Sequence, residues 1–324
     1  MAETGNWAFP EGLQPRPEDF GFDLEAALDA VVQLRAEIPD EAFTAGILGT
    51  ERAGNAVVIR EDGLALTIGY LITEAHSIWL MTNRGVVVAG HALAYDQPTG
   101  FGLVQPLAPL GVAPLARGSA AAHAVGDRVL VVGHGGRAHA LKARLVAKRE
   151  FAGYWEYVLD EALFTAPAHP QWGGAALLDE DGRLLGIGSL LVQEAVEGRA
   201  TQGNMMVPID LLEPILGELC ALGRAARPPR AWLGMYTQEV EGQLVVGGLA
   251  HGGPAERAGV KLGDQVLEVA GERASSLADL FRKVWRLGPA GSEVPLTLGR
   301  RGARVQARLH SADRAEFLLK PRMH

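Results

Sequence analysis

The chain shows two different spacings of apolar residues. Over residues 23–37 the apolar positions recur at helical spacing and Pro39 follows, which predicts an amphipathic helix. From residue 44 the spacing shifts towards two, with turn sequences such as Asn83-Arg84-Gly85 between the apolar runs. This change predicts short β-strands of a barrel or sandwich. The predicted strands cover residues 44–48, 55–60, 64–68, 77–82 and 86–94.

The middle of the chain predicts a second strand-rich part after a proline-rich connector at residues 106–117. Residues 164–191 hold three apolar runs, separated by a Gly-Gly pair and by an acidic turn. This order predicts strand, tight loop, strand, turn and strand. A helix is expected over residues 209–222, with Gly223 as its stop.

The composition restricts the classes of function. Hydrophobic residues make up 48% of the chain and charged residues 21%, which is ordinary for globular proteins with large cores. The formal net charge of −8 argues against nucleic acid as the main partner, because phosphate binding needs a basic face. A length of 324 residues is enough for at least two globular parts.

Cysteine content and the first residues bear on the compartment. Cys220 is the only cysteine, so the chain gives no sign of an oxidising compartment. The first twenty residues lack the basic start and apolar core of a secretory signal, and no stretch approaches the ~20 apolar residues of a membrane span. We therefore expect a cytoplasmic protein without a membrane span, or a periplasmic one if a signal has been removed.

Two stretches resemble the HtrA/Deg family of trypsin-like proteases. Residues 54–72, GNAVVIREDGLALTIGYLI, resemble the family's GSGVIIxxDGxILTNxHVV, and residues 169–178, HPQWGGAALL, resemble its NPGNSGGPLL. The resemblance implies a mainly β fold, a trypsin-like double β-barrel followed by a PDZ domain of the α+β class. The aromatic N-terminal segment, residues 1–22, either packs on its own domain or, as the resemblance implies, takes part in a trimer.

The resemblance places unusual residues at the three positions of the catalytic triad. Tyr70 stands where the family has its histidine, Gly100 where it has its aspartate, and Gly173 where it has its serine. Serine proteolysis needs a nucleophile that is activated by an oriented base. Glycine has no side chain, and tyrosine titrates near about 10, so it donates rather than accepts at neutral pH. We expect no catalytic residues and no enzymatic activity, as in a pseudoprotease.

Two other interpretations stay open. The chain is either a divergent serine endopeptidase with an unrecognised nucleophile or a chaperone-like holder of unfolded proteins. For the first, the nearest candidate residues are Ser189, His169, His76 and Asp96. Trp172 stands where the family has a small polar residue, so it either fills part of the cleft or packs on the loop.

The last part of the chain resembles a PDZ domain. Residues 252–272, GGPAERAGVKLGDQVLEVAGE, resemble the PDZ sequence GSPAAKAGLKPGDVIxxVNGx. A PDZ domain adds an extended peptide as a strand and holds its terminal carboxylate on the amides of one loop. The spacing of apolar residues predicts that Leu280, Val284 and Leu287 face the core. The resemblance implies these peptide-binding residues: Trp232, Leu233, Gly234, Met235, Tyr236 and Thr237, with Leu277 and Phe281 on the groove helix.

The histidines do not predict a metal site. The closest pair, His134 and His139, lies in a glycine-rich loop without carboxylates, which is typical of a turn. We therefore expect no metal and no cofactor.

Together these patterns predict five segments. They are an N-terminal extension with a helix (1–43), a double barrel without its triad (44–223), a linker (224–230), a PDZ domain (231–312) and a tail (313–324). The predicted function is a scaffold or accessory subunit that binds proteins or peptides through a C-terminal or extended segment. Nucleic acid is not expected as a partner, and the protein is expected to form a homo-oligomer or to join a hetero-complex.

Overall fold

The computed structural model describes residues 7–320, which form two compact units. Among these residues, the first unit contains residues 7–149, Glu161–Ala225 and residues 319–320. The second contains Glu150–Asp160 and Ala226–Leu318. The first six residues of the predicted N-terminal extension and the last four of the predicted tail lie outside the described residues.

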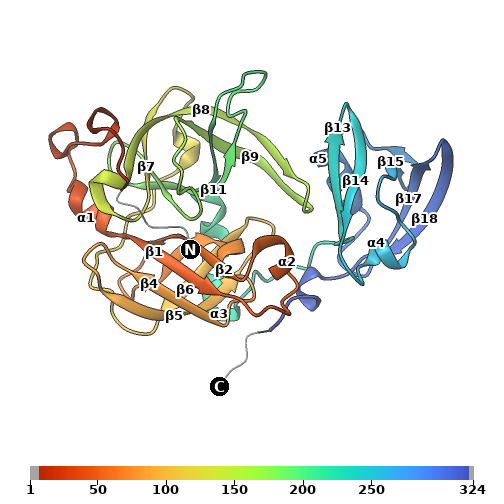
Figure 1. Cartoon of the computed structure of the whole chain (residues 1–324), viewed down its shortest axis with the longest axis horizontal. Coiled ribbons are helices and arrows are strands. Elements are labelled where there is room, and N and C mark those ends of the chain that lie inside the picture. Colours follow the sequence, from red (N-terminus) through yellow and green to blue (C-terminus); the bar gives the residue numbers. More distant parts are fainter. Residues whose placement is uncertain (1–6, 321–324) are drawn as a thin grey trace. The chain divides into compact units, whose positions relative to one another are not determined.

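The first unit begins with a closed barrel of antiparallel strands in the order β1-β2-β3-β6-β5-β4 (Figure 1). Val57, Leu66 and Leu103 of this barrel are fully buried. Four of the five predicted strands are confirmed as β2 to β5, with shifted ends. The strands are β1 (Val31–Glu37), β2 (Glu51–Val58), β3 (Ala65–Ile68), β4 (Ser77–Met81), β5 (Val87–Tyr95) and β6 (Phe101–Pro106).

The helix predicted over residues 23–37 is wrong in its second half. α1 spans Leu24–Asp29 and is capped by Asp23, and β1 follows at once. The inner positions of β1 alternate with exposed ones, and Leu34 pairs with Gly54 on one side and with Leu80 on the other. Pairing on both edges closes the barrel, and this tertiary gain outweighs the helical spacing.

The strand predicted at residues 44–48 is also wrong. This segment forms the one-turn helix α2 (Ala45–Leu48). The carboxylate of Glu74 accepts hydrogen bonds from the backbone N–H groups of Phe43 and Thr44, at 2.9 and 2.8 Å. These bonds hold the chain in a turn that the sequence pattern does not reveal.

A second closed barrel follows in the order β10-β11-β12-β9-β8-β7 (Figure 1). Its strands are β7 (Arg128–Val132), β8 (Ala140–Gly153), β9 (Tyr157–Ala166), β10 (Ala176–Leu178), β11 (Leu184–Val192) and β12 (Gly203–Pro208). The predicted order across residues 164–191 is confirmed by β9, β10 and β11. The predicted helix after β12 is split into a 3-10 turn, Ile209–Leu211, and α3 (Glu213–Leu222), which ends at Gly223 as predicted.

The second unit is a six-stranded sheet with helices, as expected for an α+β domain. The order is β13-β14-β15-β17-β18, and β16 pairs with β15. Leu280 and Val284 are buried as predicted, but Leu287 is 39% exposed because it caps the end of the helix. The elements are β13 (Met235–Val240), β14 (Gln243–Leu249), α4 (Pro254–Arg257), β15 (Gln265–Val269), β16 (Glu272–Arg273), α5 (Leu277–Arg286), β17 (Glu293–Arg300) and β18 (Ala303–His310).

The aromatic N-terminal segment packs on the first unit. The ring of Trp7 lies 4.3 Å from that of His139, and the ring of Phe9 lies 5.0 Å from that of His169. The Phe9 N–H donates to the carbonyl of Ala138 at 3.0 Å. These contacts account for the described aromatic residues within one chain, and the oligomer contact stays a prediction.

The observed architecture confirms the predicted fold class, a mainly β double barrel followed by a smaller α+β domain. Within residues 7–320, no helix combines the length and the apolar character that crossing a membrane requires.

Candidate functional site

The structure brings the three triad positions together. Tyr70 lies on the 3-10 turn Gly69–Leu71, directly after β3. The N–H of Gly69 donates to the carbonyl of Gly100 at 2.7 Å, so the Tyr70 and Gly100 positions are neighbours. A Cβ atom added to Gly173 would lie 2.9 Å from the hydroxyl of Tyr70. The phenol therefore fills the space that a side chain at position 173 would use.

Tyr70 is held as a neutral donor. Its hydroxyl donates to the carbonyl of Ser189 at 3.0 Å. Burial raises the pKa of Tyr70 far above its ordinary value, and a hydrogen bond with the Trp172 side chain opposes that shift. The Trp172 side chain thus lies beside the Tyr70 hydroxyl, which keeps its proton at neutral pH.

One backbone amide of the loop around position 173 donates to a buried histidine. In trypsin-like proteases the oxyanion hole consists of the N–H groups of the nucleophile and of the residue two positions before it. Here the second of these is Gln171, whose N–H donates to Nδ1 of His169 at 3.0 Å. The other ring nitrogen of His169 lies 2.9 Å from the carbonyl of His139. Burial lowers the pKa of His169 to about 4, so the ring is neutral and accepts at Nδ1.

Asn55 fixes the loop that carries Gly173. Its side-chain amide donates to the carbonyls of Gln171 and Gly173 at 2.9 and 3.1 Å, and its backbone N–H donates to Gly173 at 2.8 Å. Gly174 has a φ of +74°, and a Cβ there would lie 1.8 Å from the carbonyl oxygen of Asn55. Only glycine allows this close approach.

The four other candidates for a triad lie on different elements. His169 lies in the loop after β9, and Ser189 lies in β11 and accepts from Tyr70 through its carbonyl. The ring of His76 is 3.6 Å from the carboxylate of Glu37. The carboxylate of Asp96 accepts from the N–H and the hydroxyl of Thr99 at 3.0 and 2.8 Å.

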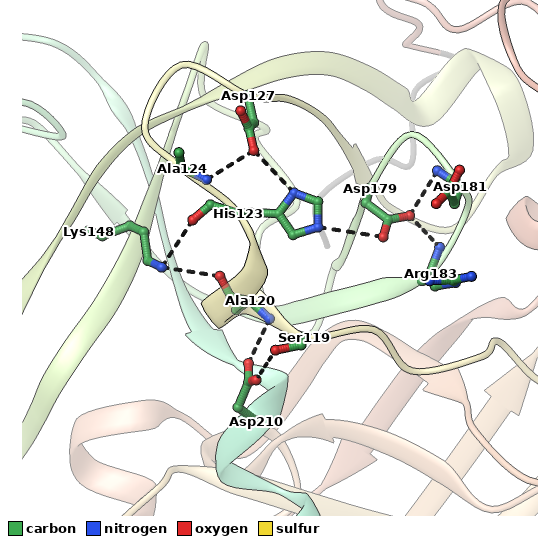
Figure 2. A network of polar contacts seen from close by, with 10 residues as sticks. All are labelled: Ser119, Ala120, His123, Ala124, Asp127, Lys148, Asp179, Asp181, Arg183 and Asp210. Carbon is green, nitrogen blue, oxygen red and sulfur yellow. Dashed lines mark hydrogen bonds and ion pairs between the residues drawn. The ribbon is translucent and has the colours of Figure 1, made fainter.

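A further cluster of serine, histidine and aspartate residues ties turns of the first unit together (Figure 2). The hydroxyl of Ser119 donates to Asp210 at 2.5 Å. Nδ1 of His123 lies 3.2 Å from Asp127, and its Nε2 lies 3.6 Å from Asp179. The serine and the histidine thus contact different carboxylates, and the cluster joins segments rather than activating a hydroxyl.

The predicted carboxylate-binding loop of the second unit holds a carboxylate. The N–H groups of Leu233 and Met235 donate to the side chain of Glu156 at 2.9 and 3.1 Å. The N–H of Gly234, which has a φ of +68°, also donates to Glu156. This left-handed residue turns the three amides towards one point, which is the geometry that binds an anion.

The other predicted groove residues flank this loop. Tyr236 and Thr237 lie on β13, and Thr237 is fully buried. Leu277 and Phe281 lie on α5 and belong to the buried apolar cluster of the second unit. Trp232 differs, because its N–H donates to the carbonyl of Ala312 at 3.1 Å and its ring packs 4.8 Å from that of Phe317.

Glu156 is the residue that the sequence analysis missed. It lies in the turn between β8 and β9, 77 residues before Leu233 in the chain, and no motif includes it. The residue is 5% exposed, and burial raises the pKa of its carboxyl to about 7 despite the three N–H donors. The structure marks this residue by a φ of +62°, which is uncommon for glutamate and cannot be seen in the sequence.

Metal-ligating side chains do not gather in the described part of the chain. Within residues 7–320, no group of three or more His, Cys, Asp or Glu residues is arranged to hold a metal ion. The predicted site residues therefore lie in the loop around Gly173 and in the second unit, where we call residues 232–235 the carboxylate-binding loop.

Two domain families match the chain. Residues 54–187 match the trypsin-like peptidase domain, and residues 231–310 match the PDZ domain. The first match contains all three triad positions, and the second contains the carboxylate-binding loop and α5.

Known proteins match over most of the chain. A protein named "Probable periplasmic serine endoprotease DegP-like" from Halomonas elongata is 25% identical over 262 residues, which cover 77% of this chain and 54% of the relative. "Serine endoprotease DegS" from Haemophilus influenzae is 22% identical, with 80% of this chain and 76% of the relative covered. The chain thus spans about half the length of the first of these relatives.

Solved structures share the fold. An HtrA-type protease AlgW with a decapeptide matches with a TM-score of 0.52 and 18% identity, covering 93% of this chain and all of the other. A serine endoprotease from Yersinia pestis matches with a TM-score of 0.52 and 20% identity, over 90% of this chain and 98% of the other.

These comparisons overturn one prediction. The residues at positions 70, 100 and 173 predicted no enzymatic activity, and this prediction is wrong, because the chain matches a peptidase domain and its relatives are named serine endoproteases.

Proposed function

Because the chain is an HtrA-type protein, with a trypsin-like peptidase domain followed by a PDZ domain, we propose that it acts on other proteins and recognises them through a terminal carboxylate. One observation carries the proposal: the N–H groups of Leu233 and Met235 converge on a carboxylate, at 2.9 and 3.1 Å. A carboxylate that accepts several backbone N–H groups is the contact by which a PDZ domain holds a peptide end.

The side chains around the loop favour a peptide with an apolar last residue. Leu233, Met235 and Phe281 belong to one buried apolar cluster, and each is at most 2% exposed. β13 provides the edge to which an extended peptide adds as a strand, and it is the first strand in the order of the sheet. Affinity then comes from main-chain hydrogen bonds and selectivity from the last side chain.

Binding to other proteins takes one of two forms in this proposal. A scaffold or accessory subunit holds one defined partner, and a chaperone-like holder takes many unfolded chains. A pull-down from the host, followed by mass spectrometry, separates them. One stoichiometric partner supports the scaffold, whereas many unrelated proteins support the holder.

The binding proposal is tested with a library of decapeptides that have either free or amidated C-termini. The full chain is expected to retain peptides with an apolar last residue and a free carboxylate, and to lose them on amidation. Retention that is indifferent to amidation would contradict the proposal. The Gly234→Ala variant is expected to weaken binding, because its Cβ would lie 3.0 Å from that of Ala250 at a left-handed φ.

Peptide-bond hydrolysis is the second candidate, and the names of the relatives favour it. Casein and a fluorophosphonate probe test it on the purified chain. Covalent labelling of a serine, mapped by mass spectrometry, would identify the nucleophile and support an endopeptidase. Intact casein and an unlabelled chain would leave recognition of other proteins as the activity.

The compartment and the assembly also stay proposals. The cytoplasmic location predicted from the first residues stands against the word "periplasmic" in the name of a relative. Fractionation of the host and sedimentation of the purified chain test location and oligomeric state.

A further inference from the structure

The turn between β8 and β9 belongs to the second unit, although its strands begin in the second barrel. Residues Glu150–Asp160 form one compact unit with Ala226–Leu318. The turn itself consists of Tyr154, Trp155 and Glu156 between the two strands. We call residues 150–160 the β8–β9 hairpin tip.

The backbone of this turn favours a residue other than glutamate. In a three-residue hairpin loop the last position is left-handed, where glycine is preferred. Glu156 occupies that position with a φ of +62°. A residue held in an uncommon backbone conformation points to a role for its side chain.

The side chain of Glu156 takes the place of a peptide end. Both of its oxygens accept from the N–H of Leu233, at 3.2 and 2.9 Å, and Oε1 accepts from the N–H of Met235 at 3.1 Å. These are the donors that the proposed function assigns to a terminal carboxylate. An incoming peptide therefore finds them occupied.

Apolar contacts of the tip also resemble those expected of a bound peptide. Val158 is 6% exposed and belongs to the same buried cluster as Leu233, Met235 and Phe281. It stands two residues after Glu156, so the tip presents a carboxylate and an apolar side chain together. The ring of Tyr154 meets that of Tyr236 on β13 edge to face, 6.2 Å away.

Charges fasten both strands of the tip to the groove helix α5. The guanidinium of Arg282 pairs with the carboxylates of Glu150 and Asp160, which lie at the two ends of the tip. A cavity of about 390 Å³ remains beside the tip. Its lining includes Tyr154 and Trp155 from the tip, Gln238 and Glu239 from β13, and Leu277 and Ala278 from α5.

We propose that the β8–β9 hairpin tip is a built-in ligand of the PDZ domain, and that a partner's C-terminus must displace Glu156 to bind. The inference rests on the proposed function, since it concerns the same loop. The occupant to be exchanged is an apolar-ended peptide with a free carboxylate. Displacement frees the tip, which continues into β8 and β9 of the second barrel.

The electrostatics around Glu156 make its docking depend on pH. Burial raises the pKa of its carboxyl from 4.5 to about 7, and the positive charge of Arg314 opposes this shift. Tyr236 is the neighbouring titratable group on β13. A raised carboxyl pKa means that docking is favoured at low pH and weakens as the pH rises through about 7. The terminal carboxylate of a free peptide, with an ordinary pKa of about 3.5, is charged over this range.

The test compares peptide binding by the wild type and by Glu156→Gly, both as the full chain. Glycine removes the carboxylate and suits the left-handed turn, so the hairpin keeps its shape. The matched control is Glu241→Gly, because Glu241 is an exposed turn residue with a φ of +51° in the same unit. The probe is fluorescein-labelled Gly-Ser-Tyr-Trp-Val, with a free or an amidated C-terminus, followed by anisotropy.

The inference predicts that Glu156→Gly binds the free-acid probe at least about tenfold more tightly than the wild type, because the competing ligand is gone. The control should bind like the wild type, and the amidated probe should bind weakly to all three. Equal affinities of the wild type and Glu156→Gly would overturn the inference and leave the proposed function intact.

Hydrogen exchange provides a readout that needs no peptide. The amides of Leu233 and Met235 should exchange faster in Glu156→Gly than in the wild type and in Glu241→Gly. Unchanged exchange would overturn the inference. If no protein bound the probe while exchange increased, the proposed function would fail and the internal ligand would stand.

Discussion

Single residues at the predicted triad positions control the shape of the loop around Gly173. The hydroxyl of Tyr70 stands 2.9 Å from the point where a Cβ at position 173 would lie, and it is anchored on the carbonyl of Ser189. Because a phenol in this place excludes a side chain, position 173 and position 70 are coupled.

This coupling predicts the effect of introducing a serine at position 173. Gly173→Ser is expected to destabilise the fold by about 1–3 kcal/mol through overpacking. The cost should shrink in a Tyr70→Ala background, because the clashing hydroxyl is absent, and thermal melts of the double-mutant cycle measure the difference. Gly217→Ser on α3 serves as control, since a Cβ there meets nothing within 4 Å. Equal costs in both backgrounds would contradict the coupling.

His169 predicts how the first unit responds to acid. Burial lowers its pKa from 6.5 to about 4. A depressed histidine pKa contributes stability that is present above 6.5 and lost as the pH falls through about 4. The loss amounts to about 3 kcal/mol at most.

Melting temperatures between pH 7 and pH 4 test this dependence. His169→Gln should flatten the acid side of the stability profile, whatever it does to stability at pH 7. The control is His251→Gln, whose side chain is fully exposed. A wild-type slope in His169→Gln would assign acid sensitivity to other groups.

The residues that could be predicted from the sequence are those inside local motifs. Tyr70, Gly100 and Gly173 follow from short stretches that resemble a protease, and the structure brings them together. Glu156 could not be predicted, because its partners lie 77 and 79 residues away and its role depends on the fold of the second unit.

At the scale of elements, the hairpin tip is attached to α5 by ion pairs. Arg282 joins the tip to α5 through two exposed ion pairs, and such pairs contribute about 0.2–1 kcal/mol each. The contacts of Glu156 and Val158 therefore provide most of the stability of the docked tip, and the ion pairs of Arg282 provide a smaller part.

This ranking predicts a small effect of Arg282→Ala. The free-acid probe should bind about two- to fivefold more tightly at low salt, and the gain should vanish at about 1 M salt because screening removes the ion pairs in the wild type as well. Arg286→Ala is the control, because Arg286 lies on the same helix but pairs with Glu272. A larger gain than in Glu156→Gly would mean that charge, not the carboxylate in the loop, holds the tip.

The elements show where sequence patterns succeed and fail. Alternating strands such as β4 and β5 could be predicted because their spacing is local. The strand at residues 31–37 could not be predicted, because the position of Leu34 fits both the helical spacing and the alternation of a strand. The choice is made by pairing with β2 and β4, which are distant in the chain.

At the scale of the whole molecule, the sequence predicts the two kinds of domain but not every boundary between the two units. The order of motifs could predict a double barrel followed by a PDZ domain, since each motif lies within one domain. It could not predict that residues 150–160 belong with the second unit, because this membership depends on burial of Glu156 and Val158.

Two units predict two thermal transitions in calorimetry. In Glu156→Gly, the free-acid probe at a hundred times its Kd should stabilise one transition by about 2.7 kcal/mol and leave the other unchanged. His169→Gln should shift only the other transition. A single transition that moves in every case would show that the units unfold together.

The most direct measurement is a pH titration of the full chain by ¹H–¹⁵N NMR. It follows the backbone amides of Leu233 and Met235 from pH 5 to pH 9. The account predicts that both signals shift with a midpoint at the pKa of Glu156, about 7, and that neither shifts in Glu156→Gln. Amides that do not titrate, or that titrate equally in Glu156→Gln, would contradict the claim that this loop is built for a carboxylate and carries its own.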